Sequence, residues 1–226
     1  MSLSLQRIVK EPAMYDTVIF DLDGTLLDTL EDLRVSTNYA LKRHGFPSRT
    51  LKEVRRFVGN GVRRLIERAM PEGASQEAFE AVFADFKAHY QIHCNDSTRP
   101  YDGIIPLLRE LKRRGCKTGI ASNKIKSAVL KLDEIYFEGL IDMAAGVSDG
   151  ILPKPAPEMV LDLLARLGSA KEHTLYVGDS EVDVQTAANA GLDFTAVLWG
   201  FRDKEELLEA GAKGFIERPA ELLEYL

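Results

Sequence analysis

Residues 16–29 read DTVIFDLDGTLLDT, an apolar run typical of a buried strand that ends in two aspartates two residues apart. A strand that only fills a core has no use for Asp21 and Asp23, because burying an unpaired carboxylate costs several kcal/mol or more. Alternation along an extended chain places both side chains on the same side. The pattern therefore predicts a site at the end of a buried strand, with a cation that compensates the two negative charges.

Composition narrows the class of protein. The chain has 226 residues, 45% of them hydrophobic, which is enough for one large domain or two smaller ones. Lys and Arg number 29 against 35 Asp and Glu, a net charge of −6. This balance argues against a nucleic-acid or membrane-surface partner, but a few placed cations can still hold a small anionic substrate. The two cysteines, Cys94 and Cys116, form no disulfide framework, so we expect a reducing, cytoplasmic location.

The N-terminal residues 1–13 read MSLSLQRIVKEPA. They contain neither an uninterrupted apolar stretch nor a small-residue cleavage site, so we expect no signal peptide. We expect the folded part to begin at Met14. The sequence is compatible with either a monomer or a homodimer.

Short apolar runs alternate with amphipathic patterns along most of the chain. The expected strands are Thr17–Asp21, Lys117–Ala121, Met143–Val147, Thr174–Gly178, Thr195–Trp199 and Gly214–Ile216. Helical faces run from Ile104 to Leu111 and from Val160 to Leu167, with Gly115 and Gly168 placed as stops. Alternating strands and helices indicate an α/β fold with a Rossmann-like parallel sheet.

One region, from Leu30 to Cys94, has no convincing strand and several helical patterns. Thr50–Glu53 fits a capping box, and an apolar stripe runs from Phe79 to Tyr90. We therefore expect an inserted, all-helical cap domain. The expected division is a core of residues 14–29 and 97–226 and a cap of residues 30–96, with hinges at Asp28–Asp32 and Asp96–Gly103.

Polar clusters lie where ligands bind in an open parallel sheet, at the carboxyl ends of strands. They are Asp21–Thr25, Ser122–Asn123, Lys154–Pro155 and Gly178–Asp183. Carboxylates, a lysine and a hydroxyl meeting at one edge suit Mg²⁺ and a phosphate group. One carboxylate can attack phosphorus while a second shuttles a proton. We also expect the Gly24 N–H to face phosphoryl oxygens, and Lys154 to offset the remaining charge.

Several of these residues also have simpler interpretations. Ser122–Asn123 could cap the following helix, Asp183 could favour a helix N-terminus, and Lys154 could be a solvated surface lysine. His89 and His93 share a helix face next to Cys94, which is the spacing of some metal ligands. No further ligand is evident nearby, so we expect this stripe to pack the cap.

These four clusters, in this order, resemble the motifs of the haloacid dehalogenase superfamily of phosphatases from Tyr15 onward. The resemblance implies that Asp21 is the nucleophile and Asp23 the general acid/base. It implies Mg²⁺ bound by Asp21, by the backbone carbonyl of Asp23 and by Asp179. Asp183 would orient the metal's waters or Lys154, and Ser122 and Asn123 would hold the phosphate. An aspartate at position 23 favours a phosphate ester over the substrates of dehalogenases.

Two further stretches resemble the phosphoglycolate phosphatase-like subgroup: Val58–Arg64 (VGNGVRR), like its lid loop, and Val197–Arg202 (VLWGFR). We expect Asn60 and Arg63, with Arg64 second, to contact an acidic substrate, although a solvated helix face explains either arginine equally well. The sequence thus predicts a Mg²⁺-dependent phosphomonoester hydrolase acting on 2-phosphoglycolate. The alternatives are a pyrophosphatase, a sugar-phosphate phosphatase or β-phosphoglucomutase, and, in another class, a catalytically silent binding module.

Overall fold

The strand that precedes Asp21 lies at the centre of the sheet. A computed structural model describes residues 15–148 and 150–226; Met14 and the residues before it lie outside this range. Strand β1, Thr17–Phe20, is buried along its whole length between two parallel neighbours. Burial on both faces is the reason that its sequence is a continuous apolar run.

The main sheet has six parallel strands in the order β5-β4-β1-β6-β7-β8. The other strands are β4 Lys117–Ile125, β5 Met143–Val147, β6 Thr174–Gly178, β7 Asp193–Val197 and β8 Gly214–Ile216. The chain fills the sheet on one side of β1 first and then on the other. This reversal opens a crevice at the carboxyl ends of β1, β4 and β6, where α/β proteins bind ligands.

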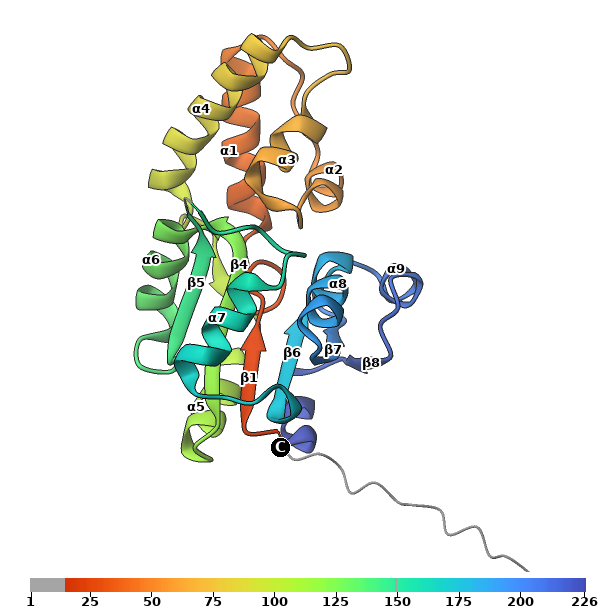
Figure 1. Cartoon of the computed structure of the whole chain (residues 1–226). Helices are drawn as coiled ribbons and strands as arrows, with labels where there is room; N and C mark the ends of the chain where they lie inside the picture. The colour runs from red at the N-terminus through yellow and green to blue at the C-terminus, as the bar shows by residue number, and fades with distance from the viewer. Residues whose placement is uncertain (1–14, 149) are drawn as a thin grey trace, which may run out of the picture.

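Helices cover both faces of the sheet (Figure 1). They are α5 Ile104–Arg113, α6 Lys126–Phe137, α7 Glu158–Leu167, α8 Glu181–Ala190 and α9 Lys204–Glu209, with 3-10 turns at Lys171–His173 and Pro219–Tyr225. Val18 and Phe20 belong to the apolar cluster of α5 and α6, whereas Ile19 packs with α7 and α8. The predicted α/β fold is therefore confirmed.

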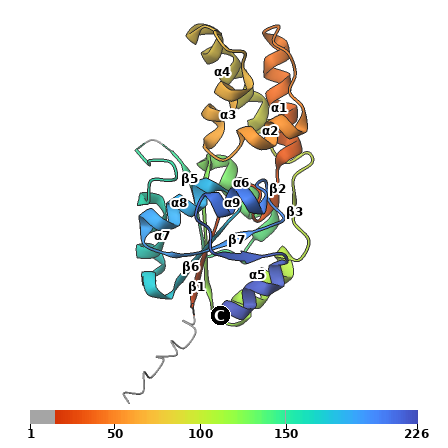
Figure 2. The ribbon, with the colours of Figure 1, turned by 90° about the vertical axis from the view of Figure 1, so that its right-hand side faces the viewer.

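Four helices stand above the carboxyl edge of the sheet (Figures 1 and 2). They are α1 Leu30–Arg43, α2 Leu51–Phe57, α3 Gly61–Ala69 and α4 Gln76–His93. Their apolar side chains form a cluster of their own, and the capping box at Thr50 and Glu53 is present as predicted. The division into a cap of residues 30–96 and a core remains our interpretation of this arrangement.

The two connections between core and cap lie side by side. Strand β2, Leu27–Asp28, pairs antiparallel with β3, Arg99–Pro100, in a short ribbon that the sequence did not predict. The Asp32 carboxylate accepts hydrogen bonds from the N–H groups of Ser97, at 2.9 and 3.1 Å, and of Thr98, at 2.9 Å. The start of α1 therefore holds the segment that returns from α4 to the core.

Four predicted strand ends shift. β1 ends at Phe20, although the Asp21 N–H still donates to the Val177 carbonyl oxygen at 2.9 Å. β4 continues to Ile125, so Ser122 and Asn123 lie within the strand, next to an irregularity in its pairing with β5. β7 starts two residues earlier than predicted because Asp193 already pairs with Leu175, and it ends at Val197 instead of Trp199. Among the described helices, none has both the length and the apolar character needed to cross a membrane.

Candidate active site

Lys154 joins two of the predicted carboxylates. Its ammonium group lies 2.8 Å from Oδ1 of Asp21 and 2.7 Å from Oδ1 of Asp183. It also lies 3.1 Å from the hydroxyl of Tyr176, on β6. All of these side chains are buried, and an interior ion pair requires such close partners. The surface-lysine interpretation of Lys154 is therefore wrong.

Asp183 combines both roles that the sequence allowed. Its Oδ2 accepts hydrogen bonds from the Ser180 N–H at 3.1 Å and the Ser180 hydroxyl at 2.6 Å, at the N-terminus of α8. Its Oδ1 faces Lys154. Asp183 therefore fixes the loop after β6 and orients the lysine at the same time.

Asp179 is enclosed by two glycines. A Cβ atom at Gly24 would lie 2.2 Å from Oδ2 of Asp179, and one at Gly200 would lie 2.3 Å from its Cβ. Only glycine fits at either position, and Gly24 also adopts a φ of 92° that favours glycine. The Phe201 N–H donates to Oδ2 of Asp179 at 2.6 Å.

The cluster carries more negative charge than its lysine offsets. One oxygen each from Asp21, Asp179 and Asp183 lie within 4.8 Å of one another. Burial raises the pKa of Asp21 to about 7, although Lys154 acts in the opposite direction. Burial and the neighbouring carboxylates also raise the pKa of Asp179. A hard cation with oxygen ligands fits such a site, because it would stabilise the ionised form of both side chains.

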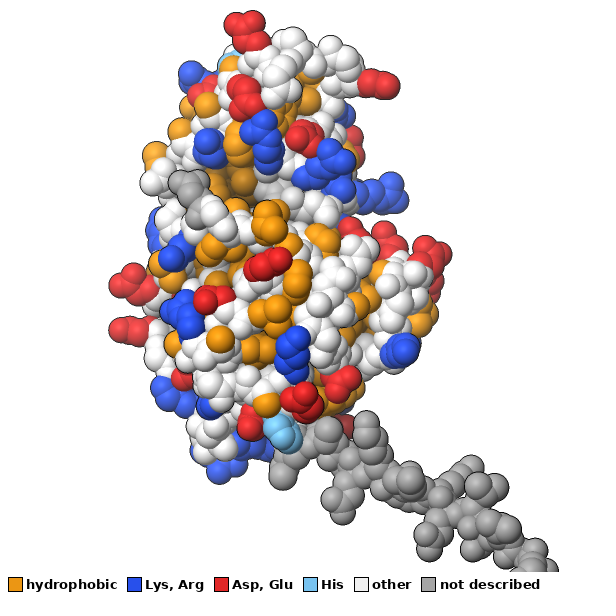
Figure 3. Space-filling view, viewed as in Figure 1, with side chains coloured by type: hydrophobic (Ala, Val, Ile, Leu, Met, Phe, Trp, Pro, Cys, Tyr) orange, Lys and Arg blue, Asp and Glu red, His pale blue; other side chains and the backbone are white. Residues whose placement is uncertain are grey.

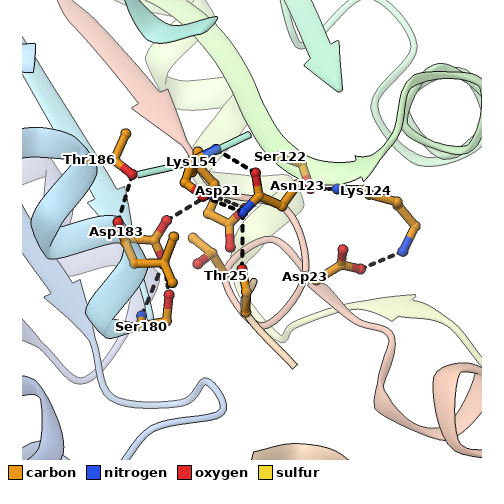
Figure 4. A network of polar contacts seen from close by, with 12 residues as sticks. Asp21, Asp23, Thr25, Ser122, Asn123, Lys124, Lys154, Ser180, Asp183 and Thr186 are labelled. Atoms are coloured by element: carbon orange, nitrogen blue, oxygen red, sulfur yellow. Dashed lines mark hydrogen bonds and ion pairs between the residues drawn. The ribbon is translucent and has the colours of Figure 1, made fainter. Parts of the chain in front are cut away.

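Asp23 has a separate partner on the other side of the loop. Its Oδ1 lies 2.6 Å from the ammonium group of Lys124, and Figure 4 shows the two side chains pointing toward each other, away from Lys154 and Asp183. Lys124 also contacts the hydroxyl of Tyr90 in α4. Burial opposes the charge of Lys124, but Asp23 and Tyr90 raise its pKa above the ordinary value, so the lysine stays protonated.

Gly24, Ser122 and Asn123 are the residues predicted to bind the phosphate. Ser122 lines the cavity, and its hydroxyl accepts the Lys124 N–H at 3.2 Å. The Asn123 amide is occupied by the main chain of Lys154. The Gly24 N–H donates to the Leu27 carbonyl oxygen at 2.9 Å, so it already has a partner within the loop.

A cavity between core and cap adjoins this cluster. Its lining comprises Asp21, Asp23, Ser122, Asn123, Lys124, Lys154, Asp179, Ser180, Phe201 and Arg202 from the core and Leu33, Val58, Gly59, Gly61, Val62 and Leu65 from the cap. The volume open to the centres of water-sized spheres is about 40 Å³. This volume holds about three water molecules, at roughly 10–15 Å³ for each. The cavity therefore places the acidic cluster beneath the cap.

The cap-loop residues predicted to contact the substrate have partners within the cap. Asn60 accepts a hydrogen bond from Arg68 at 2.8 Å, and Arg63 pairs with Glu80 at 2.5 Å while it stacks on the ring of Phe79. Neither residue lines the cavity. Arg64 pairs with Glu67 instead. The loop does reach the site, but through Val58, Gly59, Gly61 and Val62.

Charged side chains instead connect the cap to the core. Figure 3 shows Lys and Arg side chains on the side of the cap that faces Asp and Glu side chains of the core. Arg55 of α2 lies 3.0 Å from Asp203. Arg202, which is buried, pairs with Glu181 at 2.8 Å and donates to the Val58 carbonyl oxygen at 2.7 Å. These contacts hold the cap over the cavity.

The histidine stripe of α4 has protein partners of its own. His89 bonds to Ser36 at 3.0 Å and stacks on His93, which pairs with Asp96 at 2.7 Å. Among residues 15–148 and 150–226, the aspartate cluster is the one group with metal-ligand geometry. His89 therefore packs against α1, whereas 41% of the His93 side chain is exposed.

Comparison with known proteins agrees with the site. Residues 18–197 match the family described as haloacid dehalogenase-like hydrolase. The chain belongs to this family. It is 35% identical over 196 residues to a phosphoglycolate phosphatase of Rhodobacter capsulatus, covering 84% of this chain and 87% of that one. It is 30% identical over 211 residues to an N-acetylmuramic acid 6-phosphate phosphatase of Pseudomonas aeruginosa, covering 92% and 93%.

A solved structure shows the same architecture. The crystal structure of a candidate phosphoglycolate phosphatase from Lactobacillus delbrueckii subsp. bulgaricus superposes with a TM-score of 0.89 at 35% identity, covering 93% of this chain and 98% of that one. Together with the named relatives, this places the haloacid dehalogenase-like hydrolase described here among the phosphatases of its family.

Sequence reasoning missed three residues of this hydrolase's site. Lys124 follows Ser122 by two positions, so alternation along a longer β4 would have placed both on one face. Tyr176 lies within the apolar run of β6, where a phenol looks like core packing. Arg202 lies in the VLWGFR segment, but its contacts depend on how the cap packs on the core.

Proposed function

We propose that this hydrolase is a Mg²⁺-dependent phosphomonoesterase that uses Asp21 as a nucleophile and acts on 2-phosphoglycolate. The observation that carries the proposal is the Asp21–Lys154–Asp183 arrangement at the carboxyl end of β1, with Asp23 two residues further on. Lys154 binds Oδ1 of Asp21, and no described residue donates a hydrogen bond to Oδ2. That oxygen is available to attack phosphorus.

In the first step, an Asp21 oxygen forms a bond to phosphorus and the ester P–O bond breaks. The Asp23 carboxyl group gives its proton to the leaving oxygen, so the alcohol departs neutral. In the second step, a water oxygen attacks phosphorus, its proton returns to Asp23, and the bond from Asp21 to phosphorus breaks. The products are inorganic phosphate and the alcohol, and both aspartates return to their starting state.

Mg²⁺ would be held by Asp21, Asp179 and the main-chain carbonyl of Asp23. When bound, it would supply positive charge that lets an anionic carboxylate approach an anionic phosphate. Lys154 contributes a fixed positive charge beside the nucleophile, and Asp183 keeps that lysine in place.

The substrate is proposed from the names of the relatives. Several of the curated relatives are named phosphoglycolate phosphatases, and one is named N-acetylmuramic acid 6-phosphate phosphatase. The second name supports a sugar-phosphate substrate as the runner-up. The cavity under the cap lies directly beside Asp21, Asp23 and Lys154, where the phosphate group of either substrate would have to bind.

Initial rates with Mg²⁺ across 2-phosphoglycolate, N-acetylmuramic acid 6-phosphate, glucose 6-phosphate and pyrophosphate test the proposal. We expect the highest kcat/KM with 2-phosphoglycolate. Asp21→Asn should lose several orders of magnitude of activity, because an amide does not attack phosphorus. The exposed Asp162→Asn is the matched control. A preference for the sugar phosphate would replace the substrate, and near-normal turnover by Asp21→Asn would refute the mechanism.

A further inference from the structure

Lys124 is a buried cation that the chemistry proposed above leaves without a role. Its side chain is 1% exposed, and its ammonium group lies 2.6 Å from Oδ1 of Asp23, whose side chain is 15% exposed. A lysine is almost never buried so fully unless it is paired. The pair with Asp23 therefore accounts for its position at the end of β4.

A second contact connects this pair to the cap. The hydroxyl of Tyr90, a buried residue of α4, contacts the Lys124 ammonium group, which also lies 4.8 Å from the centre of the Tyr90 ring. One continuous chain of polar contacts thus runs from α4 through Lys124 to Asp23. Lys154 does not contact Asp23, because it pairs with Asp21 and Asp183 on the other side of the cluster (Figure 4).

We propose that Lys124 is a positioning residue that holds the Asp23 carboxyl group toward the leaving-group oxygen, and that Tyr90 supports it from the closed cap. The proposal rests on the proposed function, in which Asp23 protonates the leaving group. Without Lys124, the Asp23 side chain would be free to rotate, and proton transfer requires heavy atoms about 2.6–3.2 Å apart.

The dependence on the leaving group tests this role. In Lys124→Met, kcat/KM should fall about 10- to 100-fold for 2-phosphoglycolate and 2-hydroxyethyl phosphate, part of the 10²–10⁴ that a general acid supplies. It should fall no more than about 3-fold for p-nitrophenyl phosphate, whose leaving group needs no proton. Tyr90→Phe should reduce kcat/KM less than Lys124→Met does, and again more for the two alkyl phosphates than for p-nitrophenyl phosphate. Lys131→Met, an exposed lysine of α6, is the control.

A double-mutant cycle separates positioning from an independent effect. In the Asp23→Asn background, Lys124→Met should cost no more than about 2-fold on any substrate, because the group that it positions is already absent. Losses that multiply, or equal losses on all three substrates, would overturn the proposal. A loss confined to 2-phosphoglycolate would make Lys124 a carboxylate-binding residue and overturn it as well. If the parent hydrolyses no phosphate ester, the proposed function is wrong too, so the two failures are distinguishable.

Discussion

Asn123 binds the main chain of Lys154 through both atoms of its amide group. The Lys154 N–H donates to Oδ1 at 2.7 Å, and Nδ2 donates to the Lys154 carbonyl oxygen at 2.9 Å. Nδ2 also donates to the carbonyl oxygen of Gly59, in the cap loop, at 3.2 Å. One side chain therefore fixes the backbone of the buried lysine and touches the closed cap.

Asn123→Ala should reduce kcat about 10- to 100-fold and lower the melting temperature. The buried N–H of Lys154 would lose its partner, which costs about 1–3 kcal/mol, and the ammonium group would no longer be fixed beside Asp21. Steady-state kinetics and thermal unfolding measure both effects. Asn189→Ala is a matched control, since Asn189 donates to the neighbouring Pro155 carbonyl oxygen at 2.9 Å but is exposed. Equal effects of the two variants would contradict the role assigned to Asn123.

Chelation should stop turnover, and Mg²⁺ should restore it. Asp21, Asp179 and Asp183 are buried, and one oxygen from each lies within 4.8 Å of the others, so that one cation could contact all three. A cation that binds only the folded protein stabilises it by mass action. We therefore also expect added Mg²⁺ to raise the melting temperature of the EDTA-treated protein. Ca²⁺ should support little activity, because it takes more ligands at longer distances.

Asp179→Asn is the companion variant for the metal. It should lose most of the Mg²⁺-dependent rise in melting temperature, whereas Asp162→Asn, on the exposed face of α7, should keep it. Full activity in the presence of EDTA, or an unchanged thermal response in Asp179→Asn, would argue against a cation at this cluster.

The part of the site that the sequence predicted lies at strand ends. Asp21, Lys154, Asp179 and Asp183 follow or flank strands whose apolar runs are plain in the sequence, and parallel strands bring their carboxyl ends to one edge. The parallel sheet could be predicted from the same apolar runs. The missed ribbon of β2 and β3 has only two residues in each strand, too few to leave a periodic pattern.

The cap residues could not be predicted in the same way. The sequence shows that α3 is a helix with an exposed face, but the choice between solvent and cavity depends on how α3 packs on α4. In the structure, Glu80 and Phe79 of α4 engage Arg63, whereas the arginine that lines the cavity, Arg202, comes from the loop after β7. Long-range packing of this kind leaves no local signal.

Arg63→Ala should change kcat/KM by less than about 2-fold on 2-phosphoglycolate and on p-nitrophenyl phosphate, since exposed ion pairs contribute about 0–1 kcal/mol. Arg202→Met should reduce both values about 10-fold or more, because it removes a buried guanidinium whose hydrogen bonds are worth about 1.5–3 kcal/mol each. The reason is that Arg202 connects Glu181 to the Val58 carbonyl oxygen and so keeps the cap closed. A selective loss on 2-phosphoglycolate in Arg63→Ala would show that the cap rearranges when substrate binds.

Asp133, in α6, gives a prediction on pH and stability. Its Oδ1 is buried and has no hydrogen-bond partner among the described residues, and burial raises its pKa from 3.8 to about 6. A carboxyl group whose pKa is higher in the folded state than in the unfolded state destabilises the fold once it ionises. Its contribution to the free energy of unfolding should therefore fall as the pH rises from about 4 to 6, and stay constant above that range.

Asp133→Asn removes this penalty because the amide does not ionise. A shift of this size corresponds to about 3 kcal/mol at full burial. The side chain is only half-buried, and solvent reduces the expected gain to about 1–2 kcal/mol at pH 7.5. Urea unfolding of parent and variant at pH 4 and pH 7.5 measures the difference, which should nearly vanish at the lower pH. Asp162→Asn, which is exposed on α7, should show no such change with pH. A gain that is equal at both pH values would mean that packing, and not ionisation, limits stability at this position.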